Sequence, residues 1–371
     1  MSTLRVLHVA QPTDGGVARY VVEACRDQMA RGWDVAVACP PDGPLSGELA
    51  SLGVPWLPWP AGRGPGPDSL DESRRLGRLI RRQRPDVVHL HASKAGLAGR
   101  LALRRALPTL FQPHAWSWLA VDGALRRASI GWERTAARWT DLFVCVGAAE
   151  AEQGRAMCVR GRYTVVRNGV DLDRFSPADD RARAAARQQA GVDRAVPLAV
   201  CVGRLTRQKG QDVLLSAWRL VRQRCPHAEL VLVGDGDLVP VLRSAEVPGV
   251  RFAGAVTDVR PWLAAADLVV LPSRWEGLPL TALEALATGR PVVASAVPGL
   301  VEVVAPEVGA LVPPDDPAAL AGALALRLHD PSGTAVEGTA AARHARQFDL
   351  SRTFDRLASA TESLTPQGVL T

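Results

Sequence analysis

Short apolar runs alternate along the first part of the chain with segments whose apolar residues recur at helical spacing. The apolar runs lie at 4–10, 34–40, 54–59, 86–92, 108–115, 141–147 and 163–170. Helical spacing follows several of them, at about 17–31, at 69–83, and in a segment that ends near Trp139. Runs of this length, rich in Val and Leu, predict buried parallel strands, and their alternation with helices predicts a sheet covered on both faces.

A second set of apolar runs repeats this pattern after a polar, Ala- and Arg-rich stretch. The runs lie at 197–203, 228–236, 250–256, 267–273, 291–295 and 309–314. The pattern predicts an α/β protein with two doubly wound, Rossmann-like domains that face each other across a cleft, and such sheets bind ligands at the carboxyl ends of their strands. The expected divisions are a first domain at 1–172, a linker at 173–196, a second domain at 197–348, and a C-terminal helix at 349–371 that packs back on the first domain.

Composition places the chain among globular proteins of a reducing compartment. The 371 residues are 47% hydrophobic and 22% charged. The six cysteines form no C-x-x-C pair and have no zinc-site spacing, which favours the cytoplasm. The chain begins almost directly with a strand-like run, so no signal peptide is expected, and no apolar stretch is long enough to predict a membrane-spanning helix.

Charge and aromatic residues are distributed unevenly. Residues 1–170 carry 23 Lys+Arg against 15 Asp+Glu and seven of the ten Trp, whereas residues 171–371 carry 21 Lys+Arg against 23 Asp+Glu. A basic, Trp-rich half is compatible with a nucleic acid, a membrane surface, an anionic substrate or an ordinary solvated surface. Only two of the 44 basic residues are lysines, Lys94 and Lys209. Their presence is either chance or indicates a position where a phosphate requires a compact positive charge.

The stretch EGLPLTALE places two carboxylates, Glu276 and Glu284, on either side of a predicted helix start. The strand-like run 267–273 precedes it, Pro279 suits the first helical turn, and Gly289 suits the residue after the helix end. Free N–H groups and the helix dipole at such a start suit a phosphate, while carboxylates suit hydroxyl groups. A phosphate flanked by hydroxyl groups describes a nucleotide sugar; the alternative is two ordinary surface glutamates.

Cations and glycines follow other strands of the second domain. VGRLTRQKG (202–210) places Arg204 and Lys209 between a strand and a helix, where they form a clamp for a diphosphate or a basic surface turn. VGDGD (233–237) supplies Gly234 and Gly236 but lacks the third glycine of the dinucleotide fingerprint, which disfavours a dehydrogenase.

These motifs, in this order, resemble a known family. VGRLTRQKG, VGDGD, RWEGLPLTALEALATGRPVVAS and the earlier RNGVD (167–171) are similar to the motifs of retaining glycosyltransferases of family four, which have the GT-B fold. The resemblance extends from the glycine pair at 15–16 to about residue 350 and is strongest at 163–312. The spacing of seven residues between Glu276 and Glu284, with the G-L-P that it contains, is specific in the company of the other motifs.

The resemblance implies a role for individual residues. Arg204 and Lys209 would hold the donor diphosphate, Glu276 the transferred sugar and Glu284 the ribose, while His114 would meet the donor sugar from the first domain. The implied catalytic residues are Arg204, Lys209, Glu276 and His114. The implied donor-binding residues are Gly15, Gly16, Gly203, Gly234, Gly277, Leu278, Pro279 and Glu284.

The implied reaction is transfer of a sugar from a nucleotide diphosphate with retention of configuration, through an oxocarbenium-like state. No side chain is an obvious nucleophile, so we expect attack on the face that the phosphate leaves, with the phosphate taking the acceptor proton. Two D-x-D patterns, at 171–173 and 235–237, do not require a metal. We therefore expect transfer without metal or cofactor, and a UDP-sugar is favoured over a GDP-sugar as donor.

The acceptor is predicted from HLHASKAGLAGR (89–100), where Ser93 and Lys94 would form a second anion site at a helix start. Similar loops occur in family members that build polysaccharides on lipid diphosphates, and the basic segment 69–84 could lie on an anionic surface. The hypothesis is a glycan or polyprenyl-diphosphate-linked acceptor and peripheral attachment at the inner face of the membrane. A soluble natural-product or polyol acceptor stays open.

Two alternatives come from other functional classes. A nucleotide-sugar 2-epimerase shares the two-domain architecture, but the paired glutamates argue against it. A nucleic-acid-binding protein would use the basic, Trp-rich half, but no nucleic-acid motif supports it, so no nucleic-acid partner is expected.

Overall fold

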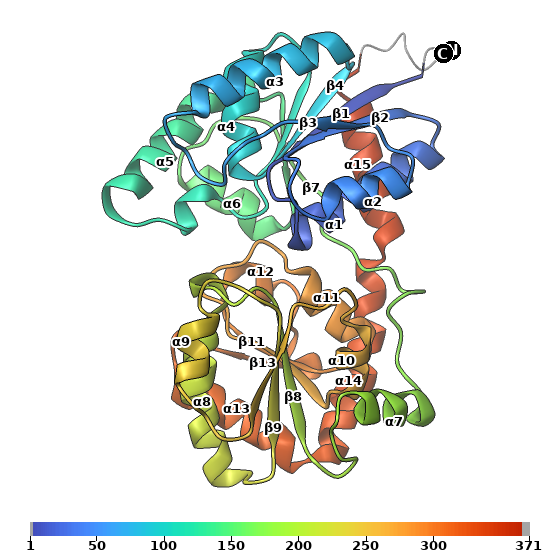
Figure 1. Cartoon of the computed structure of the whole chain (residues 1–371), viewed down its shortest axis with the longest axis vertical. Helices are drawn as coiled ribbons and strands as arrows, with labels where there is room; N and C mark the ends of the chain where they lie inside the picture. Colours follow the sequence, from blue (N-terminus) through green and yellow to red (C-terminus); the bar gives the residue numbers. More distant parts are fainter. Residues whose placement is uncertain (1–2, 366–371) are drawn as a thin grey trace. The chain divides into compact units, whose positions relative to one another are not determined.

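The computed structural model describes residues 3–365, which form two compact units (Figure 1). Unit 1 comprises the chain up to Asn168 together with the part that begins at Arg352, and unit 2 comprises Gly169–Ser351. Each unit is a parallel sheet with helices on both faces, as the alternating pattern predicts. The α/β class and the two Rossmann-like domains are therefore confirmed.

Unit 1 holds a seven-stranded parallel sheet. Its strands are β1 (Arg5–Ala10), β2 (Asp34–Cys39), β3 (Trp56–Pro58), β4 (Val87–His91), β5 (Thr109–Gln112), β6 (Leu142–Cys145) and β7 (Tyr163–Val165). The strand order is β3-β2-β1-β4-β5-β6-β7, so the direction of winding reverses between β1 and β4. This reversal is the topological switch point, where doubly wound sheets bind ligands.

The helices of unit 1 cover both faces of this sheet. They are α1 (Gly15–Ala30), α2 (Leu45–Ser51), α3 (Ser69–Gln83), α4 (Ala92–Leu103), η1 (Ser117–Leu119), α5 (Gly123–Ala136), η2 (Ala137–Trp139) and α6 (Ala148–Ala156). Residues of α3, α4 and α5 share a core with Leu7, Val9, Val88 and Leu90 of the sheet. Residues of α1 and α2 pack on the opposite face with Ala10, Val35 and Val37.

Helix α15 (Leu350–Glu362) returns the end of the chain to unit 1, as expected from the sequence. The ring of Phe354 lies 5.6 Å from that of Tyr20 in α1, measured between centroids. Arg31 forms an ion pair of 2.6 Å with Asp355, and the Thr353 hydroxyl donates a hydrogen bond to the Arg167 carbonyl. The helix therefore covers the same face of the sheet as α1.

Unit 2 holds a six-stranded parallel sheet in the order β10-β9-β8-β11-β12-β13. The strands are β8 (Leu198–Val202), β9 (Glu229–Val233), β10 (Val250–Gly254), β11 (Leu268–Leu271), β12 (Val292–Ser295) and β13 (Gly309–Val312). Each one coincides with an apolar run of the sequence. The switch point lies between β8 and β11, the equivalents of β1 and β4.

Two layers of helices enclose this sheet (Figure 1). On one face lie α8 (Gln211–Arg224), α9 (Val239–Ser244) and α13 (Pro317–His329), which share the main core of the unit. On the other face lie α10 (Arg260–Ala265), α11 (Leu280–Ala287) and α14 (Pro331–Ala345). The remaining elements are α7 (Asp180–Gln189), η3 (Arg207–Lys209), α12 (Pro298–Val301), η4 (Pro306–Val308) and η5 (Arg346–Phe348).

The segment 173–196, expected to be a linker, is part of unit 2. It contains α7, whose start is capped by the Asp179 carboxylate accepting from the Ala182 N–H at 2.7 Å. Arg187 of this helix is buried and donates to the Ala265 carbonyl at 2.8 Å. A polar, Ala/Arg-rich composition is compatible with a half-exposed helix and with a linker. Only the tertiary contacts of its arginines show that this segment belongs to the folded unit.

The tryptophans of unit 1 are structural. Trp59, Trp116 and Trp118 are at most 2% exposed, and the rings of Trp116 and Trp118 stack at 4.5 Å. In the described chain none of the seven tryptophans before residue 170 is in the exposed class. The Trp-rich composition of this half therefore reflects packing inside unit 1 rather than a row of fully exposed rings.

The basic segment 69–84 forms helix α3, whose arginines lie on its exposed side. Its apolar side is already buried, because Leu76 and Ile80 belong to the core of unit 1. The helix can attract an anionic surface, but it has no free apolar side to insert. Within residues 3–365 the helices are all too short or too polar to cross a membrane.

Candidate functional site

The carboxyl edge of the unit 2 sheet gathers most of the predicted donor-binding residues. Strands β8 and β11 are hydrogen-bonded neighbours, with Leu268 paired to Ala199 and Val269 to Val200. Gly203, Arg204 and Lys209 follow the end of β8, and the Glu276 loop follows the end of β11. Because parallel strands end at the same edge, both loops lie at the switch point of the sheet.

Lys209 and Glu276 contact each other at this edge. The Lys209 ammonium lies 2.6 Å from Oε1 of Glu276, and the Ser273 hydroxyl donates to the same oxygen at 2.6 Å. Glu276 is 8% exposed, whereas the Lys209 side chain is 19% exposed. The structure thus joins a cation assigned to phosphate with an acid assigned to sugar, and each balances the charge of the other.

Arg204 supplies an unpaired cation in the same loop as Lys209, after the end of β8. Its residue is exposed, and its guanidinium makes no hydrogen bond or ion pair with the residues that the structure describes. Its backbone is held, because Nε2 of Gln211 donates to the Arg204 carbonyl at 3.0 Å. The guanidinium is therefore available for an anionic ligand.

The glycines at this edge let backbone segments pack directly. Gly234 has φ 140°, and a Cβ there would lie 2.0 Å from the Gly203 carbonyl oxygen. A Cβ on Gly299 would lie 1.8 Å from the Gly277 carbonyl oxygen, so α12 packs against the loop between the two glutamates. Close packing of the backbone is therefore sufficient reason for glycine at 234 and 299, without any ligand. Gly203 and Gly277 are the residues whose carbonyl groups these two glycines approach.

Helix α11 starts from the Glu276 loop and carries the second glutamate. Pro279 is the residue before the helix rather than part of its first turn. Gly289, with φ 71°, ends it as predicted: its N–H bonds to the Leu286 carbonyl, and the next N–H bonds to that of Ala285. Glu284 is 3% exposed. Leu278 is also 3% exposed and can offer a ligand only backbone groups.

Arg274 holds the Glu276 loop in place, although the sequence motifs did not identify it. Its guanidinium donates to Asp212 at 2.6 Å, to Asp315 at 2.7 Å, and to the Arg207 carbonyl at 2.8 Å. The hydrogen bond to Asp212 raises the pKa of Arg274, as expected for a guanidinium paired with a carboxylate. This contact fixes the loop after β11 against helix α8.

The D-x-D patterns shape turns. A carboxylate oxygen of Asp171 accepts the N–H groups of Asp173 and Arg174 at 3.0 and 2.9 Å. A carboxylate oxygen of Asp235 accepts the Gly236 N–H at 2.7 Å. Both first aspartates thus have a local structural role.

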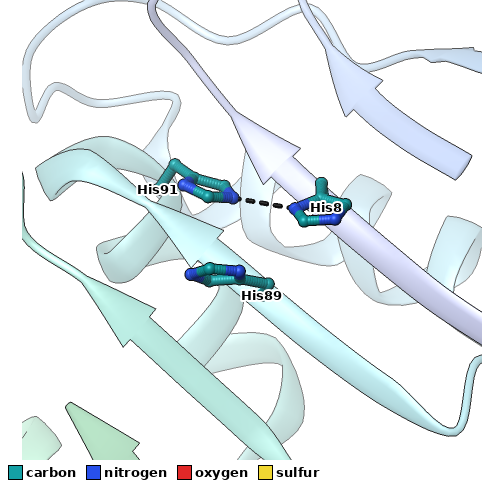
Figure 2. Close-up of side chains that lie close together, drawn as sticks. All are labelled: His8, His89 and His91. Carbon is teal, nitrogen blue, oxygen red and sulfur yellow. Dashed lines mark hydrogen bonds between the residues drawn. The ribbon is translucent and has the colours of Figure 1, made fainter. Parts of the chain in front are cut away.

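In unit 1 the switch point is occupied by histidines (Figure 2). His8 on β1 pairs in register with His89 on β4, and His91 follows two residues later on the same face. Nδ1 of His8 lies 2.9 Å from Nε2 of His91, and Nδ1 of His91 lies 3.1 Å from Nε2 of His114, which follows β5. Nε2 of His8 lies 2.8 Å from Oε1 of Gln28 in α1.

We infer the direction of this chain of hydrogen bonds from the Gln28 amide, whose Oε1 faces His8. Oε1 of Gln28 can only accept, so His8 carries its proton on Nε2 and leaves Nδ1 as an acceptor. His91 and then His114 must therefore donate from Nε2, which leaves Nδ1 of His114 as an acceptor. We call His8, His91, His114 and Gln28 the histidine chain.

Burial keeps these imidazoles neutral, as the histidine chain requires. It lowers the pKa of His8 to about 4 and that of His114 to about 3. Burial also holds the pKa values of His89 and His91 well below the usual value. The backbone of His114 has φ 52°, unusual for a residue with a side chain, and the next N–H is held by the Glu150 carboxylate at 2.6 Å.

Three of these histidines also resemble a metal site, since ring nitrogens of His8, His89 and His91 all lie within 4.8 Å of one another. Two nitrogens that share one tetrahedral zinc ion would lie about 3.3 Å apart, given bonds of about 2.0–2.1 Å. The 2.9 Å between His8 and His91 is instead a normal hydrogen-bond length. We therefore interpret the contact as a hydrogen bond. The sequence reasoning missed His8, His89 and His91, although H-x-H in a strand places two rings on one face.

The predicted second anion site is not formed. Lys94 in α4 is 5% exposed, and its ammonium lies 2.5 Å from the Glu72 carboxylate in α3. It also donates to the Gly64 carbonyl at 2.8 Å and to the Ser69 hydroxyl at 3.2 Å. All three N–H groups are used inside unit 1, so Lys94 cannot neutralise an acceptor phosphate here. Ser93 directly precedes Lys94 in α4, and a hydroxyl group there does not replace the missing cation of the predicted anion site.

Gly15 and Gly16 lie at the start of α1, directly after the β1 loop and exposed to solvent. Gly15 has φ 72°, a conformation that glycine adopts freely. The side chain of the N-cap residue Asp14 makes no capping hydrogen bond, and contact of this helix start with a phosphate or an acceptor stays a prediction.

Comparison with known proteins identifies the family of these features. The family described as "Glycosyltransferase Family 4" matches residues 14–174, and that described as "Glycosyl transferases group 1" matches residues 196–330. A D-inositol 3-phosphate glycosyltransferase of Catenulispora acidiphila is 32% identical in an alignment 397 positions long, which covers 96% of this chain and 94% of that protein.

Two further proteins are similar. An Escherichia coli UDP-Gal:alpha-D-GlcNAc-diphosphoundecaprenol alpha-1,3-galactosyltransferase is 28% identical over 80% of this chain and 81% of its own length. The crystal structure of Anabaena HepE in complex with UDP and glucose matches with a TM-score of 0.84 at 23% identity, over 97% of this chain and 100% of that one. At this identity the structural match speaks for the fold alone.

Proposed function

Because this chain belongs to glycosyltransferase family 4 and has the GT-B fold of that family, we propose that it transfers a sugar from a nucleotide diphosphate to an acceptor with retention of configuration. The observation that carries the proposal is the contact between Lys209 and Glu276 at the switch point of unit 2, beside the unpaired Arg204. Two cations, Arg204 and Lys209, together with the buried carboxylate of Glu276, suit a ligand that has both phosphates and hydroxyl groups.

The residues of unit 2 divide the work on the donor. Arg204 and Lys209 bind the diphosphate, and Lys209 exchanges part of its contact with Glu276 for a phosphate oxygen. Glu276 then accepts hydrogen bonds from hydroxyls of the transferred sugar, and Glu284 accepts them from the ribose. For His114 the proposal is contact with the donor sugar through Nδ1, the acceptor that the histidine chain leaves open.

In the proposed reaction the bond between the anomeric carbon and the diphosphate oxygen breaks as the acceptor oxygen bonds to the same face of that carbon. The acceptor proton passes to the departing phosphate oxygen. Negative charge grows on the diphosphate, so Arg204 and Lys209 lower the barrier by stabilising that charge. No step needs a metal or a cofactor.

For the donor base we propose UDP over GDP. The names of the E. coli relative and of the Anabaena structure refer to UDP-Gal and UDP respectively. For the acceptor we propose a lipid-linked sugar diphosphate, because that relative acts on a diphosphoundecaprenol substrate and the exposed arginines of α3 suit an anionic membrane. The long match to D-inositol 3-phosphate glycosyltransferases favours a phosphorylated polyol as the second candidate.

The test starts with thermal shift in UDP, GDP, ADP and dTDP, followed by hydrolysis of sugars of the winning base. Glu284→Ala should weaken binding of that nucleotide about tenfold or more, because a ribose contact is lost. The matched control is Glu246→Ala, an exposed acid of the same unit after helix α9. No stabilisation by any nucleotide, or equal effects of both substitutions, would contradict the donor assignment. Assays with polyprenyl-diphosphate-linked sugar and with inositol phosphate then separate the two acceptors.

A further inference from the structure

A cavity of about 1150 Å³ opens in unit 2 at the amino edge of its sheet. Its wall includes Pro197, Asp267 and Arg290, which directly precede or lie next to the starts of β8, β11 and β12. The proposed donor residues follow the opposite ends of β8 and β11. A strand of five residues is about 16 Å long, so the cavity is separate from the donor site.

Arginine dominates the charge of this cavity. The six arginines in its wall are Arg183, Arg194, Arg290, Arg327, Arg343 and Arg346. Two of them are neutralised within unit 2. Arg327 donates to both carboxylate oxygens of Glu337 at 2.7 Å, and Arg183 pairs with Asp267.

The other four arginines have no carboxylate contact among residues 3–365. Arg194, Arg343 and Arg346 are exposed, whereas Arg290 is only 7% exposed. Nη2 of Arg290 donates to the Ala264 carbonyl at 3.1 Å, but its Nε is buried without a hydrogen-bond partner in the described chain. The single further acid of the wall is Asp180, at the start of α7.

The six arginines of the wall outnumber its two acids, Asp180 and Asp267, so the cavity carries a net positive charge. Burial, followed by the nearby charge of Arg183, lowers the pKa of Arg290 to about 10, and the attraction of the Asp267 carboxylate offsets only part of this shift. A buried cation next to other cations is unfavourable unless an anion joins it. Planar guanidinium groups match the oxygens of a phosphoryl group, to which they donate two hydrogen bonds at once.

We propose that this cavity is a binding site for a phosphorylated small molecule, whose phosphoryl oxygens contact Arg290, Arg343 and Arg346. The volume is sufficient for a ligand the size of a sugar phosphate or a mononucleotide. The proposal rests on unit 2 alone and is independent of the donor assignment at the opposite edge.

The cavity is also connected to the donor site through one helix. The wall includes Ala287, Thr288 and Gly289, which end helix α11, and this helix begins directly after the Glu276 loop. Eight residues of helix span about 12 Å. Gly289 in turn lies against α14, since a Cβ on Gly338 would be 2.5 Å from the Gly289 carbonyl oxygen. A ligand of the cavity therefore touches the far end of a helix that carries Glu284.

The test measures binding of inorganic phosphate, glucose 6-phosphate and AMP to the full chain by calorimetry. The double substitution Arg343→Ala/Arg346→Ala is compared with Arg219→Ala/Arg224→Ala, which removes the same charge from exposed residues of α8 outside the cavity. We expect at least one phosphate to bind, and the affinity to fall about tenfold or more in the first variant only. Both pairs are exposed, and circular dichroism confirms that each variant is folded.

Two controls distinguish this site from the donor site and from a general loss of positive charge. Lys209→Ala, which disables the proposed donor site, should leave binding of the same phosphate unchanged; loss of binding there would place the ligand at the donor edge and overturn the proposal. No binding of any of the three phosphates, or equal weakening by both double substitutions, would also overturn it.

A lipid headgroup carries the same chemistry, so vesicles of phosphatidylglycerol form the last comparison. Sedimentation with vesicles that is lost in Arg343→Ala/Arg346→Ala, without binding of a soluble phosphate, would make the arginines a membrane contact and exclude the small-molecule site. Soluble binding that persists without vesicle attachment supports the site as proposed.

Discussion

The two units wind their sheets in the same order around a switch point, but they fill that point with opposite chemistry. In unit 1 the neutral rings of His8 and His91 are fully buried and hydrogen-bonded to each other. In unit 2 the charged pair of Lys209 and Glu276 stays partly open to solvent. Tyr20 of α1 packs against His91 and His114, Phe354 of α15 packs against Tyr20, and burial at that depth disfavours an ionised group. The strand order thus decides where polar side chains gather in each unit. The extent to which helices bury those side chains decides whether they are charged.

The two lysines of the chain show the same contrast. The side chain of Lys94 is 4% exposed and has three acceptors, whereas that of Lys209 is 19% exposed and contacts Glu276 alone among the described residues. The first can only stabilise the fold, and the second can exchange its partner for a ligand. Four experiments test this division between a structural unit 1 site and a reactive unit 2 site.

Acid pH should produce the largest effect, and it should act through unit 1. Because the folded pKa values of the four histidines lie below the usual 6.5, the unfolded chain binds more protons as the pH falls. Stability is complete above about pH 6.5 and is lost toward pH 4, by up to about 1.4 kcal/mol per pH unit for each histidine. Urea unfolding at pH 7, 6 and 5 measures the slope. A variant His114→Asn that keeps the slope of the parent chain would contradict this origin.

Lys94→Met should destabilise the fold by about 3–5 kcal/mol, because it leaves the Glu72 carboxylate buried and without its cation. Denaturant unfolding measures the loss. The double substitution Glu72→Gln/Lys94→Met removes both charges and should recover much of the stability. Turnover of the folded fraction should stay close to that of the parent chain. A loss of turnover without a loss of stability would instead mean that Lys94 binds the acceptor.

Lys209→Ala should show the reverse pattern in unit 2. We expect turnover to fall about 100-fold, equivalent to about 2.7 kcal/mol, since a cation at the departing diphosphate is removed. The melting temperature should change less than in Lys94→Met. Rates of donor hydrolysis and of transfer provide the measurement, and kinetics equal to those of the parent chain would exclude Lys209 from the reaction.

Gln28→Leu should have the smallest effect, about 1–2 kcal/mol of stability, because the buried Nε2–H of His8 loses its acceptor. Without that acceptor, nothing fixes which ring nitrogen of each imidazole in the histidine chain carries the proton. Nitrogen-15 NMR should show Nε2–H forms for His8, His91 and His114 in the parent chain and a mixture in the variant. An Nδ1–H form of His114 in the parent chain would mean that the chain of hydrogen bonds runs in the opposite direction.

The sequence alone predicted all the strands of both sheets and the residues that follow their carboxyl ends. The reason is local: apolar runs between helices can only be buried as parallel strands, and the loops after β8 and β11 then meet at one edge. Gly289 was also correctly identified as the helix end, because a left-handed conformation after a helix favours glycine. The helical nature of 180–189 was missed, since its polar composition has no strong apolar side.

What the sequence determined by itself is therefore the two-sheet architecture, the family, and the edge of the unit 2 sheet at which Lys209 and Glu276 meet. Only the tertiary structure decided which charges are free. Glu72 lies 22 residues before Lys94, and Gln28 lies 20 residues after His8, so neither pairing has a local signal. The six arginines of the cavity likewise come from separate segments between 183 and 346. Charge balance depends on which side chains meet in space, and a one-dimensional pattern does not contain those distances.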